Sequence, residues 1–203
     1  MLKGFISGIM AGILISIGGS VFLACDVKYV GAILFSVALL CICYKGYALF
    51  TGKVGYIPES HKKEDVKLLI MALLGNFAAT YLVGRVIGLT NSSFYETAQN
   101  LCAAKLSQNS LQTFVRATMC GILMYLAVSI YRDKKTVIAI LFCIPVFILS
   151  GFEHSIANMF YFAVGDMYSI QTGIYLLIVV IGNSVGGMLL PALEKIGDLF
   201  SGK

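Results

Sequence analysis

Long apolar stretches separated by short polar segments make up most of this chain. Several of them approach the roughly 20 residues that a helix needs to cross a bilayer. The pattern predicts six membrane spans, at residues 4–24, 30–50, 66–90, 112–131, 136–164 and 172–193. We therefore expect an all-α integral membrane protein in which residues 1–203 form a single transmembrane domain. The first apolar run is long for a signal peptide, so we expect it to stay as an uncleaved span.

A weak internal repeat relates the two halves of the chain. Residues 32–35 and 139–142 both read Ala-Ile-Leu-Phe, and Gly75-Asn76 recurs as Gly182-Asn183. Each match lies 107 positions further along the chain. Similar segments in the same order at one offset indicate a structural repeat.

The repeat predicts two halves, at about residues 1–92 and 110–198. Each half holds three spans, and an odd number of spans makes the two halves cross the membrane in opposite directions. Such inverted repeats place a permeation site near the middle of the membrane, between two discontinuous helices. Gly46 and Gly151 occupy matching positions and predict these breaks in the second and fifth spans. The alternative is that both glycines only pack ordinary helices closely.

Glu153 and His154 stand beside Gly151 in one of the most apolar parts of the chain. Residues 136–149 just before them carry no charge. Ionisable side chains are costly in hydrocarbon, so they are expected to face a protein interior or a water-filled pathway. Backbone groups exposed by a helix break are tolerated at that depth only where they are buried or line a cavity. Together these features predict a permeation site.

His154 is the residue that we expect to meet the permeating solute. The ordinary pKa of an imidazole, about 6.5, lets it share a proton with an anion near neutral pH. A structural histidine with satisfied hydrogen bonds is the alternative. The other histidine, His61, is expected at the surface, in the charged segment 59–67.

Three further polar side chains in the apolar runs are expected to support the site. A carboxylate on Glu153 would repel an anion, so we expect it to face away from the pore and to accept hydrogen bonds from backbone N–H groups freed at the break. A role for Glu153 as a proton donor stays open. Asn76 and Asn183 are expected to bond across helices and to hold the broken segments.

Composition and charge distribution agree with a membrane protein. Hydrophobic residues make up 59% of the chain, charged residues 12%, and the mean hydropathy is +0.89. A soluble domain has about 25% charged residues. The net charge of +5 comes from cations near the span ends and does not indicate a nucleic-acid partner.

The placement of these cations predicts the orientation in the cell membrane. With the N-terminus in the cytoplasm, the outside segments keep only Lys28 and Lys105. The inside set is Lys3, Lys53, Lys62, Lys63, Lys67, Arg132, Lys134, Lys135, Lys195 and Lys203. Cytoplasmic segments carry the excess of lysine and arginine, so both termini are expected in the cytoplasm. Lys45, Arg85 and Arg116 remain inside or at the edges of spans.

The motif around His154 closely resembles that of a known family. Residues 151–159, Gly-Phe-Glu-His-Ser-Ile-Ala-Asn-Met, are similar to the fifth-span motif of the formate/nitrite transporter family. Residues 48–51 resemble its broken second span, and residues 182–187 resemble its last span. The resemblance covers almost the whole chain. It implies a homopentamer of six-span, aquaporin-like subunits, each with its own pore for a small monovalent anion.

The resemblance also assigns pore residues to positions of this chain. It implies that His154 is the central histidine and that Thr51 is the threonine in the loop that breaks the second span. Lys105 corresponds to a lysine that attracts anions in the outer vestibule; from the residues alone it is a solvated lysine of the polar segment 99–112. The implied hydrophobic constrictions are Phe35 and Phe147 towards the outside, and Leu39, Phe50 and Met124 towards the inside.

Two departures from the family pattern bear on the choice of anion. Gly121 stands where many members carry an asparagine, and Ala48 stands where an acidic or polar residue precedes Leu-Phe-Thr. Both departures look more like the hydrosulfide channel branch, so we predict a channel for HS⁻. The first alternative is a formate or nitrite channel, or a proton-linked transporter, of the same family.

Two other classes of protein fit the sequence less well than an anion channel. An aquaporin-like pore for neutral solutes is the second alternative, although the sequence lacks paired Asn-Pro-Ala boxes. An enzyme is not expected, because the sequence shows no metal-ligand constellation, no nucleophile–base pair and no Gly-rich phosphate loop. The six cysteines have no CxxC pair or metal-ligand spacing, so neither a metal nor a cofactor is expected.

Overall fold

The computed structural model describes residues 1–60 and 62–201. The predicted surface residue His61 and the predicted cytoplasmic residue Lys203 therefore lie outside the described residues. All regular secondary structure within the described ranges is helical, as the sequence predicts. The chain is an all-α protein.

Most of the predicted spans coincide with helices that are long and apolar enough to cross a membrane. Within the described residues these helices are α1 (Leu2–Ala24), α2 (Lys28–Lys45), α5 (Lys63–Thr90), α7 (Ser110–Lys134) and α10 (Ile170–Ser201). The predicted fifth span, 136–164, contains two shorter apolar helices, α8 (Ile138–Leu149) and α9 (Ser155–Val164). Short elements follow α2, namely α3 (Phe50–Lys53), the 3₁₀ turn η1 (Val54–Tyr56) and α4 (Ile57–Ser60).

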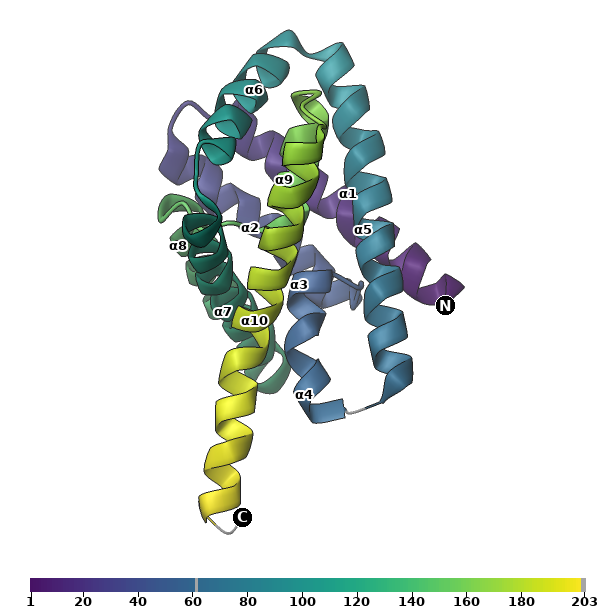
Figure 1. The fold of residues 1–203 in the computed structure, drawn as a ribbon, viewed down its shortest axis with the longest axis vertical. Helices are drawn as coiled ribbons and strands as arrows, with labels where there is room; N and C mark the ends of the chain where they lie inside the picture. Colours follow the sequence, from purple (N-terminus) through teal and green to yellow (C-terminus); the bar gives the residue numbers. More distant parts are fainter. Residues whose placement is uncertain (61, 202–203) are drawn as a thin grey trace.

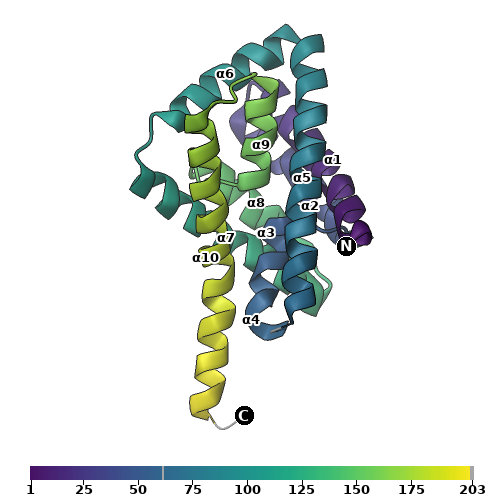
Figure 2. The ribbon, with the colours of Figure 1, turned by 45° about the vertical axis from the view of Figure 1, so that its right-hand side comes forward.

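The helices pack in two matching pairs around the short helices. The helix α1 lies along α5, and α7 lies along α10. The helix α9 lies on the side towards α6 (Ser92–Leu106), which crosses one end of the molecule, and α3 and α4 lie towards the opposite end (Figure 1). The C-terminal part of α10 extends beyond the other helices at that opposite end (Figure 2). The two helices that follow the breaks, α3 and α9, are the ones buried within the bundle.

Small residues allow the paired helices to approach very closely. A Cβ atom added to Gly8 of α1 would lie 2.5 Å from the carbonyl oxygen of Ala72 in α5. A Cβ atom added to Gly121 of α7 would overlap the carbonyl oxygen of Asn183 in α10. Close backbone contact of this kind is how membrane helices gain van der Waals packing, since lipid supplies no hydrophobic drive between them.

Both predicted helix breaks are present, and both begin at a glycine with positive φ. Gly46 (φ 68°) ends α2, and Gly151 (φ 66°) follows α8. In each case the next amide reaches back five residues: Tyr47 donates to the Ile42 carbonyl at 3.0 Å, and Phe152 donates to the Phe147 carbonyl at 2.9 Å. A Cβ atom at Gly46 would meet nothing within 4 Å, so the left-handed backbone, and not space, requires glycine there.

The helix α6 does not appear in the sequence-based assignment, which treats residues 99–112 as a polar segment. The side chain of Asn91 caps α6 by accepting a hydrogen bond from the Phe94 amide at 3.1 Å. Hydropathy detects membrane spans, and α6 is too polar to be one. The sequence did carry one signal for this helix, namely Asn91, because asparagine is a preferred N-cap residue.

Two glycines of α10 differ in how closely they approach α7, and this difference can be tested. A Cβ atom at Gly186 would overlap the Thr118 carbonyl oxygen, whereas one at Gly173 would meet nothing within 4 Å. We expect Gly186→Ala to lower the unfolding temperature by several degrees, at about 2–4 °C per kcal/mol for a chain of this size. Gly173→Ala should match or exceed the wild type, because alanine favours helix by about 1 kcal/mol over glycine. Circular dichroism of the detergent-solubilised protein on heating measures both, and equal melting would contradict the close packing.

Candidate permeation site

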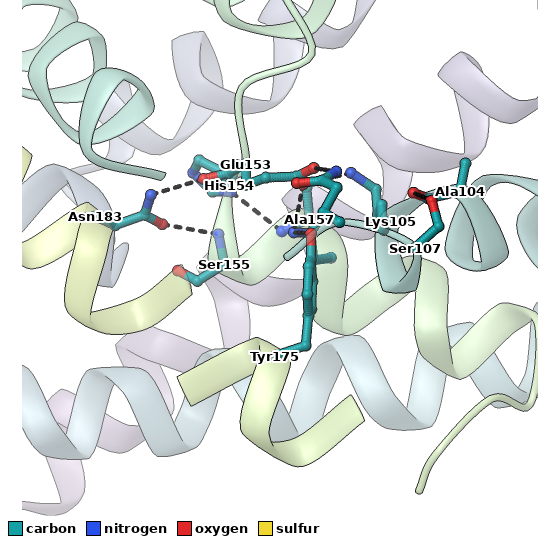
Figure 3. A network of polar contacts seen from close by, with 11 residues as sticks. Ala104, Lys105, Ser107, Glu153, His154, Ser155, Ala157, Tyr175 and Asn183 are labelled. Atoms are coloured by element: carbon teal, nitrogen blue, oxygen red, sulfur yellow. Dashed lines mark hydrogen bonds and ion pairs between the residues drawn. The ribbon is translucent and has the colours of Figure 1, made fainter. Parts of the chain in front are cut away.

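Asn183 holds the second helix break from the neighbouring helix α10. Its Oδ1 accepts a hydrogen bond from the Ser155 amide at 2.8 Å, and its Nδ2 donates to the Glu153 carbonyl at 2.7 Å (Figure 3). Nδ2 also donates to the carbonyl of Ala117 in α7 at 2.8 Å. The side chain is fully buried. One amide group therefore satisfies backbone groups on both sides of His154 and ties them to α7.

Asn76 makes the same three bonds at the first break. Its Oδ1 accepts from the Phe50 amide at 2.9 Å. Its Nδ2 donates to the carbonyl of Ala48 at 3.0 Å and to the carbonyl of Gly8 in α1 at 2.8 Å. The two breaks thus share one construction, in which a buried asparagine of the following long helix binds the start of the short helix.

His154 is the N-cap of α9, and both of its ring nitrogens have partners. Nδ1 accepts a hydrogen bond from the Ala157 amide at 3.1 Å, and Nε2 lies 2.9 Å from Thr51 Oγ1. A backbone N–H can only donate, so Nδ1 carries a lone pair. In the neutral ring the proton is therefore on Nε2, which donates to the Thr51 hydroxyl oxygen. The hydroxyl hydrogen of Thr51 can then point to another acceptor.

A cavity of about 200 Å³ ends at His154 and opens beside α6. We call it the α6 cavity; α6 and the segment 147–161, which contains the second helix break, supply most of its lining. Phe35 and Phe147 border it, with their rings edge to face and 6.3 Å apart. Phe147 also stacks on the His154 ring at 5.5 Å. The two phenylalanines predicted as a constriction thus lie directly beside the histidine.

A second cavity, of about 210 Å³, lies on the other side of the short helix α3. We call it the α3 cavity; its apolar lining includes Ile42, Leu49 and Val128. Three cations also border it, Lys53, Arg132 and Lys135. The segment between the two cavities contains Thr51 and His154, which are both buried.

The order of side chains along α2 places the two cavities one above the other. Phe35 borders the α6 cavity and Ile42 borders the α3 cavity. Positions four and seven residues apart share a helix face, and seven residues span about 10 Å along the axis. Leu39 therefore lies on that same face, between the two cavities, and it is buried.

The other two predicted inner constriction residues are buried but border neither cavity. Phe50 and Met124 belong to the same apolar cluster as Phe35, Leu39 and Phe147. Leu49, which sequence reasoning did not select, borders the α3 cavity instead. Its signal was the repeat: Leu49 follows Gly46 by three residues, as His154 follows Gly151.

Glu153 is neutralised by a ring of side-chain donors. Its carboxylate accepts hydrogen bonds from Lys105 Nζ at 2.6 Å, Gln108 Nε2 at 2.7 Å and Asn158 Nδ2 at 2.9 Å. The expectation of backbone donors was wrong, because the carboxylate turns towards α6 and its nearest donors are side chains. It also borders the α6 cavity and does not face away from it. Tyr175 joins the ring by accepting from Asn158 Nδ2 at 3.3 Å.

Lys105 lies at this ring and not in open solvent. Its side chain is only 13% exposed, and it forms an ion pair with Glu153, which is 2% exposed (Figure 3). The pair leaves this corner of the α6 cavity without net charge. Among the described residues, no three His, Cys, Asp or Glu side chains converge as a metal site requires.

Comparison with known proteins agrees with the fold and the site motif. The sequence profile described as "Formate/nitrite transporter" matches residues 1–195. The chain belongs to the formate/nitrite transporter family. As a member of a family of channels and transporters, it is a membrane protein and not an enzyme.

Relatives in this family include bacterial and archaeal transporters. The uncharacterized transporter YwcJ of Bacillus subtilis is 28% identical over 93% of this chain and 86% of its own length. A probable formate transporter of Methanothermobacter thermautotrophicus is 30% identical over 82% of this chain and 73% of its own length. The solved structure of a pentameric formate channel with formate bound is 25% identical and superposes with a TM-score of 0.83, covering 100% of this chain and 98% of that one.

The two departures from the family pattern are not among the residues that line the α6 cavity or the α3 cavity. Gly121 is buried where α7 meets α10, and a Cβ there would overlap the Asn183 carbonyl oxygen. Ala48 donates its amide to Ser7 Oγ at 2.9 Å and borders a third cavity between α1 and α5. Neither residue lines the α6 cavity or the α3 cavity, so the choice between hydrosulfide and the formate/nitrite anions stays a prediction.

The asparagine at the second break can be tested against its neighbour in sequence. Asn183→Ala leaves the Ser155 amide and two carbonyls without partners, and each buried unpaired group costs about 1–3 kcal/mol. We expect a large fall in the unfolding temperature and in the yield of folded protein. Ser184→Ala should behave like the wild type, because its hydroxyl bonds only to Val180 within α10, at 2.7 Å. Thermal unfolding of both variants in detergent checks this; matching curves would contradict the role of Asn183.

Proposed function

We propose that the protein is a channel for a small monovalent anion of a weak acid. The observation that carries this proposal is the α6 cavity, which ends at a buried histidine paired with Thr51. Two phenylalanines stand at its inner end, and Leu39, Phe50 and Met124 are the proposed apolar constriction between His154 and the α3 cavity. Apolar constrictions of this kind exclude strongly hydrated ions.

The proposed architecture is six spans in two inverted repeats. The first repeat, about 1–92, consists of α1, the broken pair α2–α3, and α5. The second, about 110–198, consists of α7, the broken pair α8–α9, and α10. The equivalent bonds of Asn76 and Asn183 support this pairing, because each joins the third span of its repeat to the broken one. A homopentamer with one pore in each subunit follows from the likeness to the pentameric formate channel.

The orientation follows from the cations at the two ends of the path. Lys53, Arg132 and Lys135 border the α3 cavity, so that end faces the cytoplasm. Both termini then lie in the cytoplasm of a cell whose plasma membrane holds the channel. The α6 cavity faces the outside of the cell, and anions reach His154 through it.

The site offers an anion neutral hydrogen-bond donors. The Nε2–H of His154 and the hydroxyl of Thr51 are paired with one another, and an anion that arrives through the α6 cavity can accept from either. Lys105 does not hold it there, since Lys105 is paired with Glu153. Conduction requires binding that is weak enough for release. The anion of a weak acid can take a proton from the solvent that reaches the α6 cavity and then cross the apolar constriction as the neutral acid, while the neutral ring and the hydroxyl supply hydrogen bonds and no proton.

Formate and nitrite are the first anions to test. The related solved channel holds formate, and a relative of 27% identity in Salmonella typhimurium is the nitrite transporter NirC. Hydrosulfide is the second candidate, because an aperture that admits a three-atom anion admits a diatomic one. A neutral-solute pore remains an outcome of the same test.

The decisive experiment is anion uptake into proteoliposomes. Wild-type protein should conduct formate, nitrite or hydrosulfide faster than chloride, because chloride is the anion of a strong acid and cannot take a proton. His154→Asn should slow the weak-acid anions by about tenfold or more, equivalent to about 1.4 kcal/mol at the barrier. Absence of any anion flux in the wild type would contradict a channel. Glycerol flux without anion flux would indicate a neutral-solute pore.

A second test separates the contribution of the Thr51 hydroxyl group from that of the size of the side chain. Thr51→Val leaves the buried Nε2–H of His154 without an acceptor, at a cost of about 1–3 kcal/mol. We expect formate uptake to fall about tenfold. Thr51→Ser keeps the hydroxyl and should stay within about twofold of the wild type, in line with the small effect of removing one methyl group. Equal rates for the two variants would show that the hydroxyl is not used.

A further inference from the structure

Arg116 is a cation of the α6 cavity that has no role in the site described above. It lies on α7 and borders the cavity together with Lys105 and Glu153. Its side chain is exposed in the subunit. Over residues 1–60 and 62–201, the ion pairs do not include it, whereas Lys105 is paired with Glu153 at 2.6 Å.

The position of Arg116 is deep for a charged residue. It follows the start of α7 at Ser110 by six residues, which is about 9 Å along a helix axis. A permanent charge at that depth is expected to face a cavity or protein, since hydrocarbon does not solvate it.

The backbone and side chain of Arg116 both lie against the second helix break. Its carbonyl accepts a hydrogen bond from the Glu153 amide at 3.3 Å. A Cβ atom at Gly151 would lie 3.8 Å from its Nη1 atom. The guanidinium therefore lies within van der Waals reach of position 151, at the edge of the cavity.

The charges that border the cavity sum to one positive unit. Lys105 and Glu153 cancel at contact distance, and Arg116 remains. Both members of a contact ion pair are already satisfied, so Lys105 attracts a distant anion only through the small difference between its field and that of Glu153. Among the described residues, Arg116 has no ion-pair partner to cancel its charge, and the apolar walls of the cleft focus its field on an entering ion.

We propose that Arg116, and not Lys105, is the cation that draws anions into the α6 cavity. This rests on the proposed function, since it names the capture residue of that pore. The planar guanidinium offers two parallel N–H donors, which match the two oxygens of formate or nitrite. HS⁻ has a single heavy atom and cannot bind in that way. Arg116 therefore favours capture of the oxygen-bearing anions over hydrosulfide.

The test is formate uptake into proteoliposomes at two ionic strengths, with Arg116→Gln, Arg116→Lys and the wild type. At about 20 mM salt the Debye length is about 20 Å, and at about 500 mM it is near 4 Å. Arg116→Gln should lower uptake by about three- to tenfold at low salt, and this loss should shrink to less than about twofold at high salt. Arg116→Lys should keep most of the salt-dependent attraction and lose formate relative to HS⁻.

Two controls make the outcome decisive. Lys28→Gln removes a cation that lies over the ring of Phe22 at the cavity without lining the cavity itself, and at low salt it should lower uptake by less than Arg116→Gln does. Size-exclusion chromatography of each variant reports the oligomer. The proposal is overturned if Arg116→Gln conducts like the wild type, if its loss is the same at both salt concentrations, or if the variant dissociates the oligomer. Failure of the wild type to conduct any anion would instead overturn the proposed function.

Discussion

The structure depends on satisfying backbone groups that two helix breaks expose inside an apolar bundle. An unpaired N–H or carbonyl in lipid costs several kcal/mol, so a break persists only where side chains replace the lost helical bonds. Asn76 and Asn183 do this with one acceptor bond and two donor bonds each. Because Asn183 binds the residues on both sides of His154, the same bonds that stabilise the break also fix the histidine at the end of the cavity.

The electrostatics of the site follow from how its charges are paired. Glu153 is buried against Lys105, Gln108 and Asn158, and this pairing removes a negative charge that would repel an anion near His154. The neighbouring imidazole and hydroxyl are neutral, so they can bind an anion and still release it. In the proposed channel, attraction over a distance is separate from this step and depends on the cations that border the two cavities. Such a division lets a channel select anions without trapping them.

Hydropathy and the internal repeat predicted most of the fold. They placed the long apolar helices and both breaks, since Gly46 and Gly151 mark positions where only a left-handed backbone ends the helix. They missed α6, whose polar sequence resembles a loop and whose helix depends on an N-cap and on packing across the bundle end. They also missed the partners of Glu153, because Lys105 and Gln108 lie 48 and 45 residues away along the chain. No local pattern predicts a contact of that kind.

The sequence by itself determined the membrane-spanning class, the positions of the breaks and the histidine beside one of them. These follow from composition, spacing and backbone preference, which are local properties of the chain. Only the tertiary structure decided that Thr51 meets His154, that Lys105 forms an ion pair with Glu153, and that Gly121 lies in a helix contact and lines neither cavity. The physical reason is that hydrogen bonds, ion pairs and steric contacts depend on distances between segments, which hydropathy along one chain does not contain.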